Sequence, residues 1–253
     1  MIFRSDALQS KLILVTGASS GLGRAVAVEA SMLGASVILC GRNAEQLDHT
    51  LAQMQGTTHR VIAADAGNLD DMHAMIVDAA AQNGPIHGLF HSAGTSGVRL
   101  AKTISVSHVD AMFGAAVNGA LGIAKAASKR NVMEDGGSIV FMSSVAAIRG
   151  KAGMVAYSAA KSAVQGLTRA LAAELAPRRI RVNEILAGAI ETEMHEKIIS
   201  SLDEAGVDAY RNRHPLGFGA PSDIASAATF LLSDAARWIT GSALSVDGGY
   251  AII

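Results

Sequence analysis

Short runs of apolar and β-branched residues recur along the chain and alternate with longer stretches of helical periodicity. Strands that are bounded by turn residues and separated by helices are typical of a parallel sheet covered by helices on both faces. The pattern therefore predicts an α/β protein with a doubly wound, seven-stranded parallel sheet, in a single domain over residues 1–253. The predicted strands lie near 11–16, 36–41, 59–65, 87–92, 137–143, 180–186 and 243–247.

A glycine-rich segment, Thr16–Gly23, joins the first predicted strand to the first predicted helix. Gly17 permits a tight turn, Gly21 lets the backbone approach a pyrophosphate, and Gly23 lets the helix pack closely on the strand. Dinucleotide phosphates would then lie at the helix N-terminus, where unpaired N–H groups and the helix dipole favour anions. Three glycines alone would also suit a flexible loop, but the flanking strand and helix favour a Rossmann-type dinucleotide site.

A second segment, Tyr157–Lys161, carries residue types that can move a proton. Tyr157 and Lys161 are four residues apart, so they would share one face of a helix. A free tyrosine has a pKa of about 10, and a neighbouring ammonium lowers that pKa. Such a pair also occurs by chance on surface helices. Ser144, thirteen positions before Tyr157, supplies a hydroxyl at the end of the apolar run 139–142 and makes the chance explanation weaker.

These segments resemble, in this order, the motifs of the short-chain dehydrogenase/reductase family over essentially the whole chain. Asp65 falls where the family holds the adenine, and Asn118 falls at its catalytic asparagine. Residues 239–241 and 246–249 resemble its C-terminal signature. The resemblance implies a single-domain Rossmann fold and reversible hydride transfer between a nicotinamide and a carbonyl carbon.

The resemblance also implies which residues would act. Tyr157 would donate a proton to the carbonyl oxygen, and Ser144 would hydrogen-bond that oxygen. Lys161 would contact the nicotinamide ribose and lower the pKa of Tyr157, while Asn118 would position a water that links Lys161 to solvent. Ser143 is the competing serine, but the family spacing favours Ser144, and Ser143 would point into the structure. The residues expected to bind the cofactor are Gly17, Ser19, Ser20, Gly21, Leu22, Gly23, Arg42, Asp65, Ala66, Ala93, Gly94, Tyr157, Lys161, Gly188, Ile190 and Thr192.

Two positions depart from the family pattern. His91–Ser92 replaces the usual Asn-Asn pair, so a shorter hydroxyl stands where a side-chain amide usually braces the central sheet. Ala187–Gly188 replaces the usual Pro-Gly beside the nicotinamide. Losing proline frees a φ angle and restores an N–H group, so we expect a less rigid loop there.

The end of the second predicted strand bears on the choice of cofactor. Relatives that prefer NAD tend to carry an aspartate at the position of Gly41, where the carboxylate accepts from the ribose 2′-hydroxyl and would repel a 2′-phosphate. Arg42, one residue on, can pair with that phosphate through its planar fork. An arginine after a strand is also often only a solvated loop residue. We therefore expect NADP(H) as the preferred cofactor, without excluding NAD(H).

Composition narrows the class of partner. The chain has 253 residues, of which 50% are hydrophobic, and a net charge of −1. It can therefore form one large core but offers no basic field for nucleic acid. The N-terminal residues lack the apolar stretch of a signal peptide, and the nearly uncharged stretch 111–124 is too short to span a bilayer. We expect a cytoplasmic protein without membrane or nucleic-acid partners.

The cysteine and histidine residues give no support for thiol or metal chemistry. The single cysteine, Cys40, ends an apolar strand and is expected to be a buried spectator. The eight histidines lack metal-ligand spacing, so no metal is expected.

The substrate class is inferred from resemblance to a family more than from the residues themselves. The pattern is closest to 3-oxoacyl-(acyl-carrier-protein) reductases, which implies an NADPH-dependent ketoreductase and ranks a 3-oxoacyl thioester first. Residues 189–216 combine charges and glycine with weak periodicity and form the candidate substrate lid. Arg178–Arg179, expected beside the active-site mouth, would meet an acidic carrier, whereas Glu134–Asp135 argues against one.

Other functions stay open. Arg149, Lys151, Met154, His195 and Lys197 would equally line a polar pocket for a small, cyclic or sugar ketone. A nicotinamide-sensing binding protein with inactive chemistry is a minor alternative, because all four catalytic positions carry the active residue types. Sugar-nucleotide epimerases and dehydratases are a second alternative. They usually have another glycine spacing and a larger C-terminal substrate domain. A homotetramer is expected by resemblance, and the stretches 105–130 and 157–176 are apolar on more than one face.

Overall fold

The strands form one parallel sheet, as predicted. The computed structural model describes residues 4–200 and 202–252, without the side chain of Lys197. The sheet has the order β3-β2-β1-β4-β5-β6-β7, and every neighbouring pair is parallel. The strands are β1 (Leu12–Thr16), β2 (Ser36–Gly41), β3 (Arg60–Ala63), β4 (Ile86–His91), β5 (Met133–Ser144), β6 (Arg181–Ala187) and β7 (Ala243–Val246).

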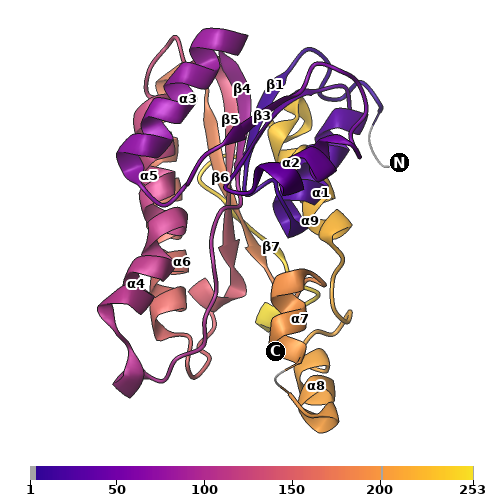
Figure 1. The fold of residues 1–253 in the computed structure, drawn as a ribbon, viewed down its shortest axis with the longest axis vertical. Coiled ribbons are helices and arrows are strands. Elements are labelled where there is room, and N and C mark those ends of the chain that lie inside the picture. Colours follow the sequence, from indigo (N-terminus) through magenta and orange to yellow (C-terminus); the bar gives the residue numbers. More distant parts are fainter. Residues whose placement is uncertain (1–3, 201, 253) are drawn as a thin grey trace.

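Helices cover the sheet on both faces. α1 and α9 pack together on one face, while α3, α5 and α6 cover the other (Figure 1). The helices are α1 (Gly21–Met32), α2 (Ala44–Leu51), α3 (Leu69–Asn83), α4 (Val106–Phe113), α5 (Gly119–Ala127), α6 (Val155–Leu175), α7 (Glu193–Ile199), α8 (Glu204–Arg211) and α9 (Pro221–Leu232). A π-helical segment, Gly114–Asn118, joins α4 to α5, and short 3-10 turns lie at Ala101–Thr103, Val145–Ala147, Ala176–Arg178, Asp234–Ala236 and Tyr250–Ile252.

The core is divided by the sheet into two layers. In β1, Ile13 and Val15 pack in the layer under α1 and α9, whereas Leu14 packs in the opposite layer. Successive side chains of a strand point to opposite faces, so a strand that is buried on both faces is apolar at every position. This explains why the strands were visible in the sequence as continuous apolar runs.

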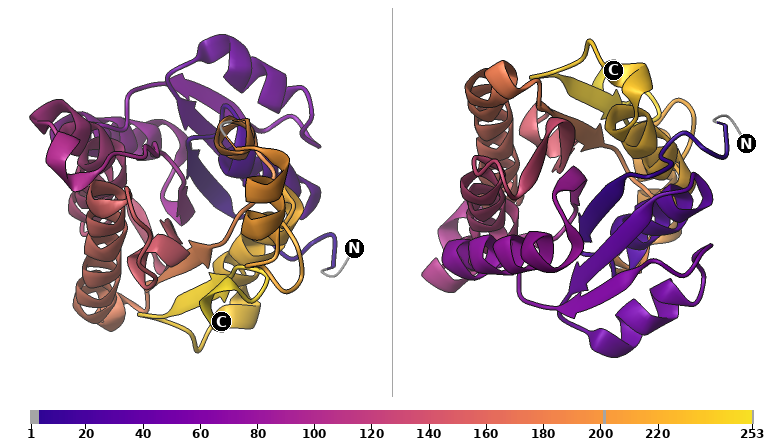
Figure 2. Two further views of the ribbon diagram at one scale, coloured as in Figure 1. Left: turned by 90° about the horizontal axis from the view of Figure 1, so that it is seen from below. Right: turned by 90° about the horizontal axis from the view of Figure 1, so that it is seen from above.

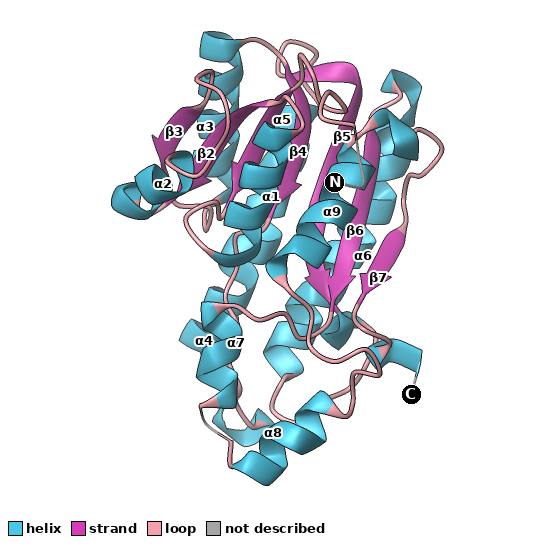
Figure 3. Ribbon diagram, turned by 90° about the vertical axis from the view of Figure 1, so that its right-hand side faces the viewer, coloured by secondary structure: helices cyan, strands magenta, loops and turns pink. Residues whose placement is uncertain are grey.

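The carboxyl ends of the strands all meet at one edge of the sheet. The strand order reverses between β1 and β4, which is where a doubly wound sheet leaves room for a ligand. The arrowheads of β5 and β6 point toward the part of the molecule built by α4, α7 and α8 (Figure 3). Figure 2 shows the molecule from below and from above, with helices on both sides of the sheet. The candidate lid, 189–216, contains α7 and α8 and lies at this carboxyl edge.

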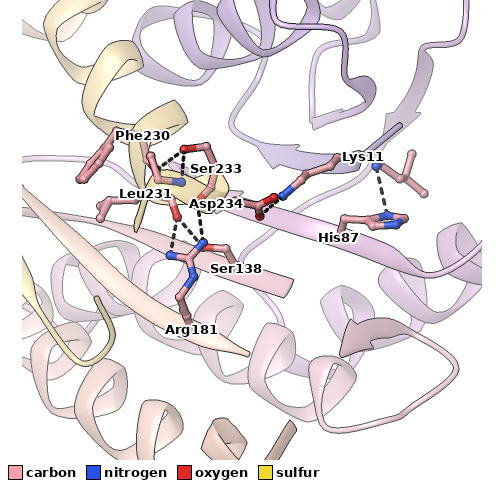
Figure 4. A network of polar contacts seen from close by, with 10 residues as sticks. Lys11, His87, Ser138, Arg181, Phe230, Leu231, Ser233 and Asp234 are labelled. Carbon is pink, nitrogen blue, oxygen red and sulfur yellow. Dashed lines mark hydrogen bonds and ion pairs between the residues drawn. The ribbon is translucent and has the colours of Figure 1, made fainter. Parts of the chain in front are cut away.

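A network of polar contacts lies at the opposite, amino edge of the sheet (Figure 4). Buried Arg181 donates to the carbonyl oxygens of Leu231 at 2.7 Å and Ser233 at 3.0 Å, which end α9. Lys11 pairs with Asp234 at 2.6 Å. These contacts fix α9 against the starts of the strands.

Arg178–Arg179 also lies at this amino edge, so its predicted place beside the active-site mouth is wrong. α6 has 21 residues and carries the chain about 30 Å along the sheet. Arg178 donates to Asp135 at 2.7 Å and to the carbonyl oxygen of Ala127 at 2.7 Å. The arginine therefore closes the far end of α6 and does not face the carboxyl edge.

Three further predictions concern the whole chain. None of the helices described is both long and apolar enough to cross a bilayer. Within the described part of the chain, no group of histidine, cysteine and acidic residues could hold a metal ion. Cys40 is buried, and this burial raises the pKa of its thiol to about 12.

Candidate active site

The glycine loop after β1 has the geometry that close packing requires. Gly17 has a φ of +68°, and a Cβ on Gly23 would lie 2.2 Å from the carbonyl oxygen of Gly17. A side chain at Gly17, which is left-handed, or at Gly23 would therefore not be tolerated without moving the turn. Ser20 is the N-cap residue of α1 but makes no side-chain capping bond, so the N–H groups of the first turn stay free for a ligand.

The loops after β1 and β4 approach each other where the strand order reverses. A Cβ on Gly17 would lie 2.9 Å from the backbone nitrogen of Ala93, and a Cβ on Gly94 would lie 3.8 Å from the Lys161 ammonium. This places the glycine loop, Ala93–Gly94 and Lys161 around one site. Because the glycines carry no side chains, the backbone there is open to a dinucleotide, and the residues fit a nicotinamide cofactor.

The residues that follow β2 and β3 border the same site. A Cβ on Gly41 would lie 3.3 Å from Leu47 Cδ2 and 3.4 Å from Ser19 Oγ, so a larger residue at Gly41 would be crowded. Arg42 is exposed directly after β2. Asp65 is exposed after β3, and one carboxylate oxygen accepts from the backbone N–H of Gly67 at 3.0 Å. Buried Ala66 follows Asp65.

The candidate proton-transfer residues lie together at the end of β5. Ser144 ends β5, and its hydroxyl forms a hydrogen bond with the phenol of Tyr157 on α6. Lys161, one turn further along α6, is buried and donates to the carbonyl oxygen of Met142 at 2.9 Å. Its ammonium lies 5.8 Å from the centre of the Tyr157 ring. Ser143 points into the structure, as expected, and donates to the backbone oxygen of Lys161 at 3.2 Å.

The ionisation of these groups differs from the expectation in one respect. Burial raises the pKa of Tyr157, and the hydrogen bond from Ser144 partly opposes that rise. The pKa of Tyr157 is thus raised, whereas the sequence predicted that the Lys161 ammonium would lower it. Burial lowers the pKa of Lys161 itself to about 8, with the nearby Glu184 carboxylate acting the other way.

Asn118, the fourth predicted catalytic residue, lies on a different element from Ser144, Tyr157 and Lys161. It ends the π-helical segment between α4 and α5 and is exposed, whereas Ala116, two residues earlier, is buried. Segments of π-helix are frequent at functional sites. The catalytic role of Asn118 stays a prediction.

His91 is a structural residue that the sequence interpretation missed. Its ring is buried at the end of β4, where Nδ1 contacts Thr16 Oγ1 at 2.7 Å and Nε2 contacts the carbonyl oxygen of Ala115 at 2.8 Å. Burial lowers its pKa to about 4, so the ring is neutral at pH 7. His91 therefore braces β1 and the α4–α5 segment, which compensates for the departure at His91–Ser92. Its signal in the sequence is a histidine within an apolar strand.

The segment after β6 is held more firmly than expected. Ala187 belongs to β6 and is paired with Ser144 on one side and Val246 on the other. A Cβ on Gly188 would lie 2.8 Å from Asp247 Cα, so only glycine fits there. The missing proline is thus compensated by strand pairing on both sides.

Ile190 and Thr192 continue along the same edge. Ile190 forms an isolated parallel bridge with Gly219. Thr192 is the N-cap residue of α7, and its methyl carbon would lie 3.6 Å from a Cβ on Gly21. Thr192 therefore sits over the glycine loop and links it to the candidate lid.

The candidate lid rests on an aromatic cluster. The His195 ring lies 4.6 Å from Phe218, and the Tyr210 ring lies 5.4 Å from His214, measured between ring centres. Burial lowers the pKa of both histidines, so both are neutral at pH 7. The Tyr250 ring packs at a tilt against His214, with the two ring centres 4.8 Å apart. The predicted role of the Lys197 side chain lies outside what the structure describes.

Comparison with known proteins identifies the class. A family model described as Enoyl-(Acyl carrier protein) reductase matches residues 17–251. The chain is 37% identical to a D-threitol dehydrogenase of Mycolicibacterium smegmatis, over 97% of this chain and 94% of that protein. It is 32% identical to a 3-oxoacyl-(acyl-carrier-protein) reductase of Thermotoga maritima, over 97% of this chain and 99% of that protein.

Solved structures agree. A blue fluorescent protein from a metagenomic library, in complex with NADPH, superposes with a TM-score of 0.88 at 30% identity and covers 97% of this chain and 99% of its own. A sheet of this order, with a glycine loop and a Ser-Tyr-Lys cluster at its carboxyl edge, defines a nicotinamide-dependent oxidoreductase. The chain belongs to the short-chain dehydrogenase/reductase family, whose members bind NAD(P)(H) and act on alcohol and ketone groups.

Proposed function

We propose that the protein is an NADPH-dependent ketoreductase that interconverts a ketone and a secondary alcohol. The observation that carries this proposal is the hydrogen bond between Ser144 and Tyr157, at a site that Lys161 and the glycine loop share. Because burial raises its pKa, the Tyr157 phenol is protonated near neutral pH and is ready to donate. That state suits reduction of a ketone better than oxidation of an alcohol.

Each residue has a part in this proposal. Bound nicotinamide would supply the hydride. Ser144 would hold the carbonyl oxygen, and Tyr157 would give it a proton. Lys161, beside Gly94, would bind the ribose hydroxyls and keep positive charge near the phenolate that remains. Asn118, which is exposed, would position a water that links Lys161 to solvent. The residues 189–216 are proposed as the lid.

Replacing Tyr157 tests the chemistry directly. We expect Tyr157→Phe to lower kcat at least about 100-fold, because it removes the proton donor and leaves the ring in place. Titration with NADPH should stay within a few-fold of the wild type. Turnover of Tyr157→Phe at the wild-type rate would overturn the assignment of Tyr157 as the proton donor. A wild type that binds NADPH but reduces no ketone would favour a non-catalytic nicotinamide-binding protein.

The preference for NADPH is supported by the crowded Gly41 and the exposed Arg42 after β2. We expect kcat/KM to be higher with NADPH than with NADH. Arg42→Ala should reduce that ratio about tenfold, because a charge-assisted contact to the 2′-phosphate is lost. The matched control is Arg237→Ala, an exposed arginine after α9. A wild-type preference for NADH would contradict the proposal.

Two substrate classes follow from the relatives, whose names include a carrier-linked oxoacyl reductase and a D-threitol dehydrogenase. The position of Arg178 at the amino edge removes the charge argument for a docked carrier protein. A 3-oxoacyl thioester remains one candidate and a small, cyclic or sugar ketone the other. NADPH oxidation on free and carrier-linked acetoacetyl thioesters, beside a panel of ketones and a nucleotide sugar, separates them. A homotetramer and a cytoplasmic location stay predictions.

A further inference from the structure

Basic side chains gather where the β5–α6 connection faces the segment that follows α8. Lys151, in that connection, places its ammonium 4.6 Å from the centre of the Tyr210 ring of α8. A cavity of about 340 Å³ opens here, lined by Arg149, Gly150, Arg213 and Tyr250, so Arg213 lies close to the residue that precedes Lys151. Burial and, secondarily, the like charge of Arg213 lower the pKa of Lys151.

Lys151 and Arg213 have no ion-pair partner in the described part of the chain. Among residues 4–200 and 202–252, no carboxylate forms an ion pair with either of them. The Asp247 carboxylate, which acts on His214, accepts from the backbone N–H groups of Gly249 at 3.0 Å and Ala251 at 2.8 Å. Two cations held close without an ion-pair partner repel each other, and an anion bound between them would relieve that repulsion.

Tyr210 links the cavity to the proposed proton donor. Its ring carries the Lys151 ammonium, and its phenol lies within electrostatic reach of both Tyr250 and Tyr157. Tyr250, which lines the cavity, packs on His214 with the ring centres 4.8 Å apart. A molecule with one end at Lys151 and Arg213 would extend past Tyr210 toward Tyr157.

We propose that the ketone reduced at Tyr157 carries an anionic group, such as a carboxylate, and that Lys151 and Arg213 bind this group. The inference rests on the proposed ketone reduction and adds the chemical class of the substrate. Hydrogen bonds from cationic donors to a carboxylate are stronger than those between neutral groups, so they select an anionic substrate over a neutral one of the same shape. A neutral ketone would leave the two cations without a counter-charge.

Matched pairs of substrates test this selection. We would measure NADPH oxidation on 3-oxobutanoate, 4-oxopentanoate and 5-oxohexanoate, each beside its methyl ester, because the ester removes the charge and keeps the chain. At least one acid should exceed its ester about tenfold in kcat/KM. Equal values for acid and ester in all pairs would overturn the anionic substrate while leaving ketone reduction intact.

Variants locate the selection. Lys151→Met and Arg213→Ala should each lower the acid-to-ester ratio about tenfold, and raised salt should lower it further in the wild type. Arg237→Ala, which removes an exposed arginine elsewhere, should leave the ratio unchanged. Ratios that are equal in the wild type, Lys151→Met and Arg213→Ala would reject these residues as the anion site.

Calorimetry separates this inference from the proposed function if no ketone is turned over. Binding of the oxo-acids and esters to the NADPH-loaded protein is then compared in the wild type and in Arg213→Ala. Oxo-acid binding that is lost in Arg213→Ala supports the anion site and counts against ketone reduction alone. Failure of every oxo-acid to bind more tightly than its ester overturns the anion site.

Discussion

At the scale of single residues, the active edge contains a buried acid that the proposed chemistry does not use. Glu184 lies in β6, is only 1% exposed, and its Oε2 has no hydrogen-bond partner. Burial raises its pKa to about 7, against a hydrogen bond with Ser143 and the charges of Arg169 and Lys161. The Glu184 carboxyl is therefore close to half ionised near neutral pH, and its charge acts on Lys161 of the proton-transfer cluster.

This acid should make stability depend on pH in a defined direction. Because the folded state favours the protonated form, the contribution of Glu184 to stability is greatest below the ordinary pKa of 4.5 and is lost as the pH rises through about 7. Glu184→Gln should therefore exceed the wild type in free energy of unfolding by about 1–3 kcal/mol above pH 8, with the difference disappearing toward pH 4.

Denaturant melts across this pH range measure the effect. Glu174→Gln, an exposed acid on α6, is the matched control and should shift the free energy of unfolding by less than about 0.5 kcal/mol at any pH. A Glu184→Gln variant that is less stable than the wild type at high pH would show that the carboxylate is stabilised rather than strained.

At the scale of elements, α1 begins without a side-chain cap. The N-cap Ser20 makes no side-chain hydrogen bond to the first turn, and the same holds at the N-caps of α5, α6 and α9. An uncapped helix N-terminus leaves N–H groups that an anion can satisfy. Among these four helices, α1 is the one that directly follows the glycine loop and should face the cofactor phosphates. The other described α-helices are capped by the side chains of Asn43, Asn68, Ser105, Thr192 and Asp203.

Two helix glycines predict opposite effects of the same substitution. Gly23→Ala places a Cβ 2.2 Å from the carbonyl oxygen of Gly17, so the loop must move; we expect about 2–4 kcal/mol lower stability and at least tenfold weaker NADPH binding. Gly166 on α6 has nothing within 4 Å of such a Cβ, and Gly166→Ala should stabilise by about 0.5–1 kcal/mol. Thermal melts measure the change in stability, and fluorescence titration measures NADPH binding. Equal effects of both substitutions would refute the packing argument.

At the scale of the whole molecule, the sheet ends in an open edge. β7 pairs only with β6 and has exposed positions along its length. Trp238, shortly before β7, is 96% exposed, and Ile252 after it is 82% exposed. Large apolar side chains beside an unpaired strand are typical of a surface that another copy covers.

The predicted homotetramer is tested at this surface. Light scattering at micromolar concentration should give the mass of four chains, and Trp238→Glu should lower that mass, because a charge cannot be buried unpaired in an interface. Arg237→Glu changes the charge at the neighbouring position and serves as the control for charge alone. A monomeric wild type would reject the assembly.

The elements and the local chemistry could be predicted from the amino-acid sequence alone. The central strands β1 and β2 are apolar runs because both faces of the sheet are covered there. Gly17 and Gly23 follow from short-range contacts within one turn. The spacing of Tyr157 and Lys161 is a property of one helix, so it too could be predicted without a fold. Such features depend on residues a few positions apart, where backbone geometry fixes the outcome.

Which side chains lie together depends on the tertiary packing. The length of α6 places Arg178 at the amino edge, away from the site where a carrier protein would dock. The same packing put Glu184 under Lys161 and brought Lys151 to Tyr210, which lies far along the chain. These relations depend on helix length, face and strand order summed over many residues, and no local pattern in the sequence encodes that sum.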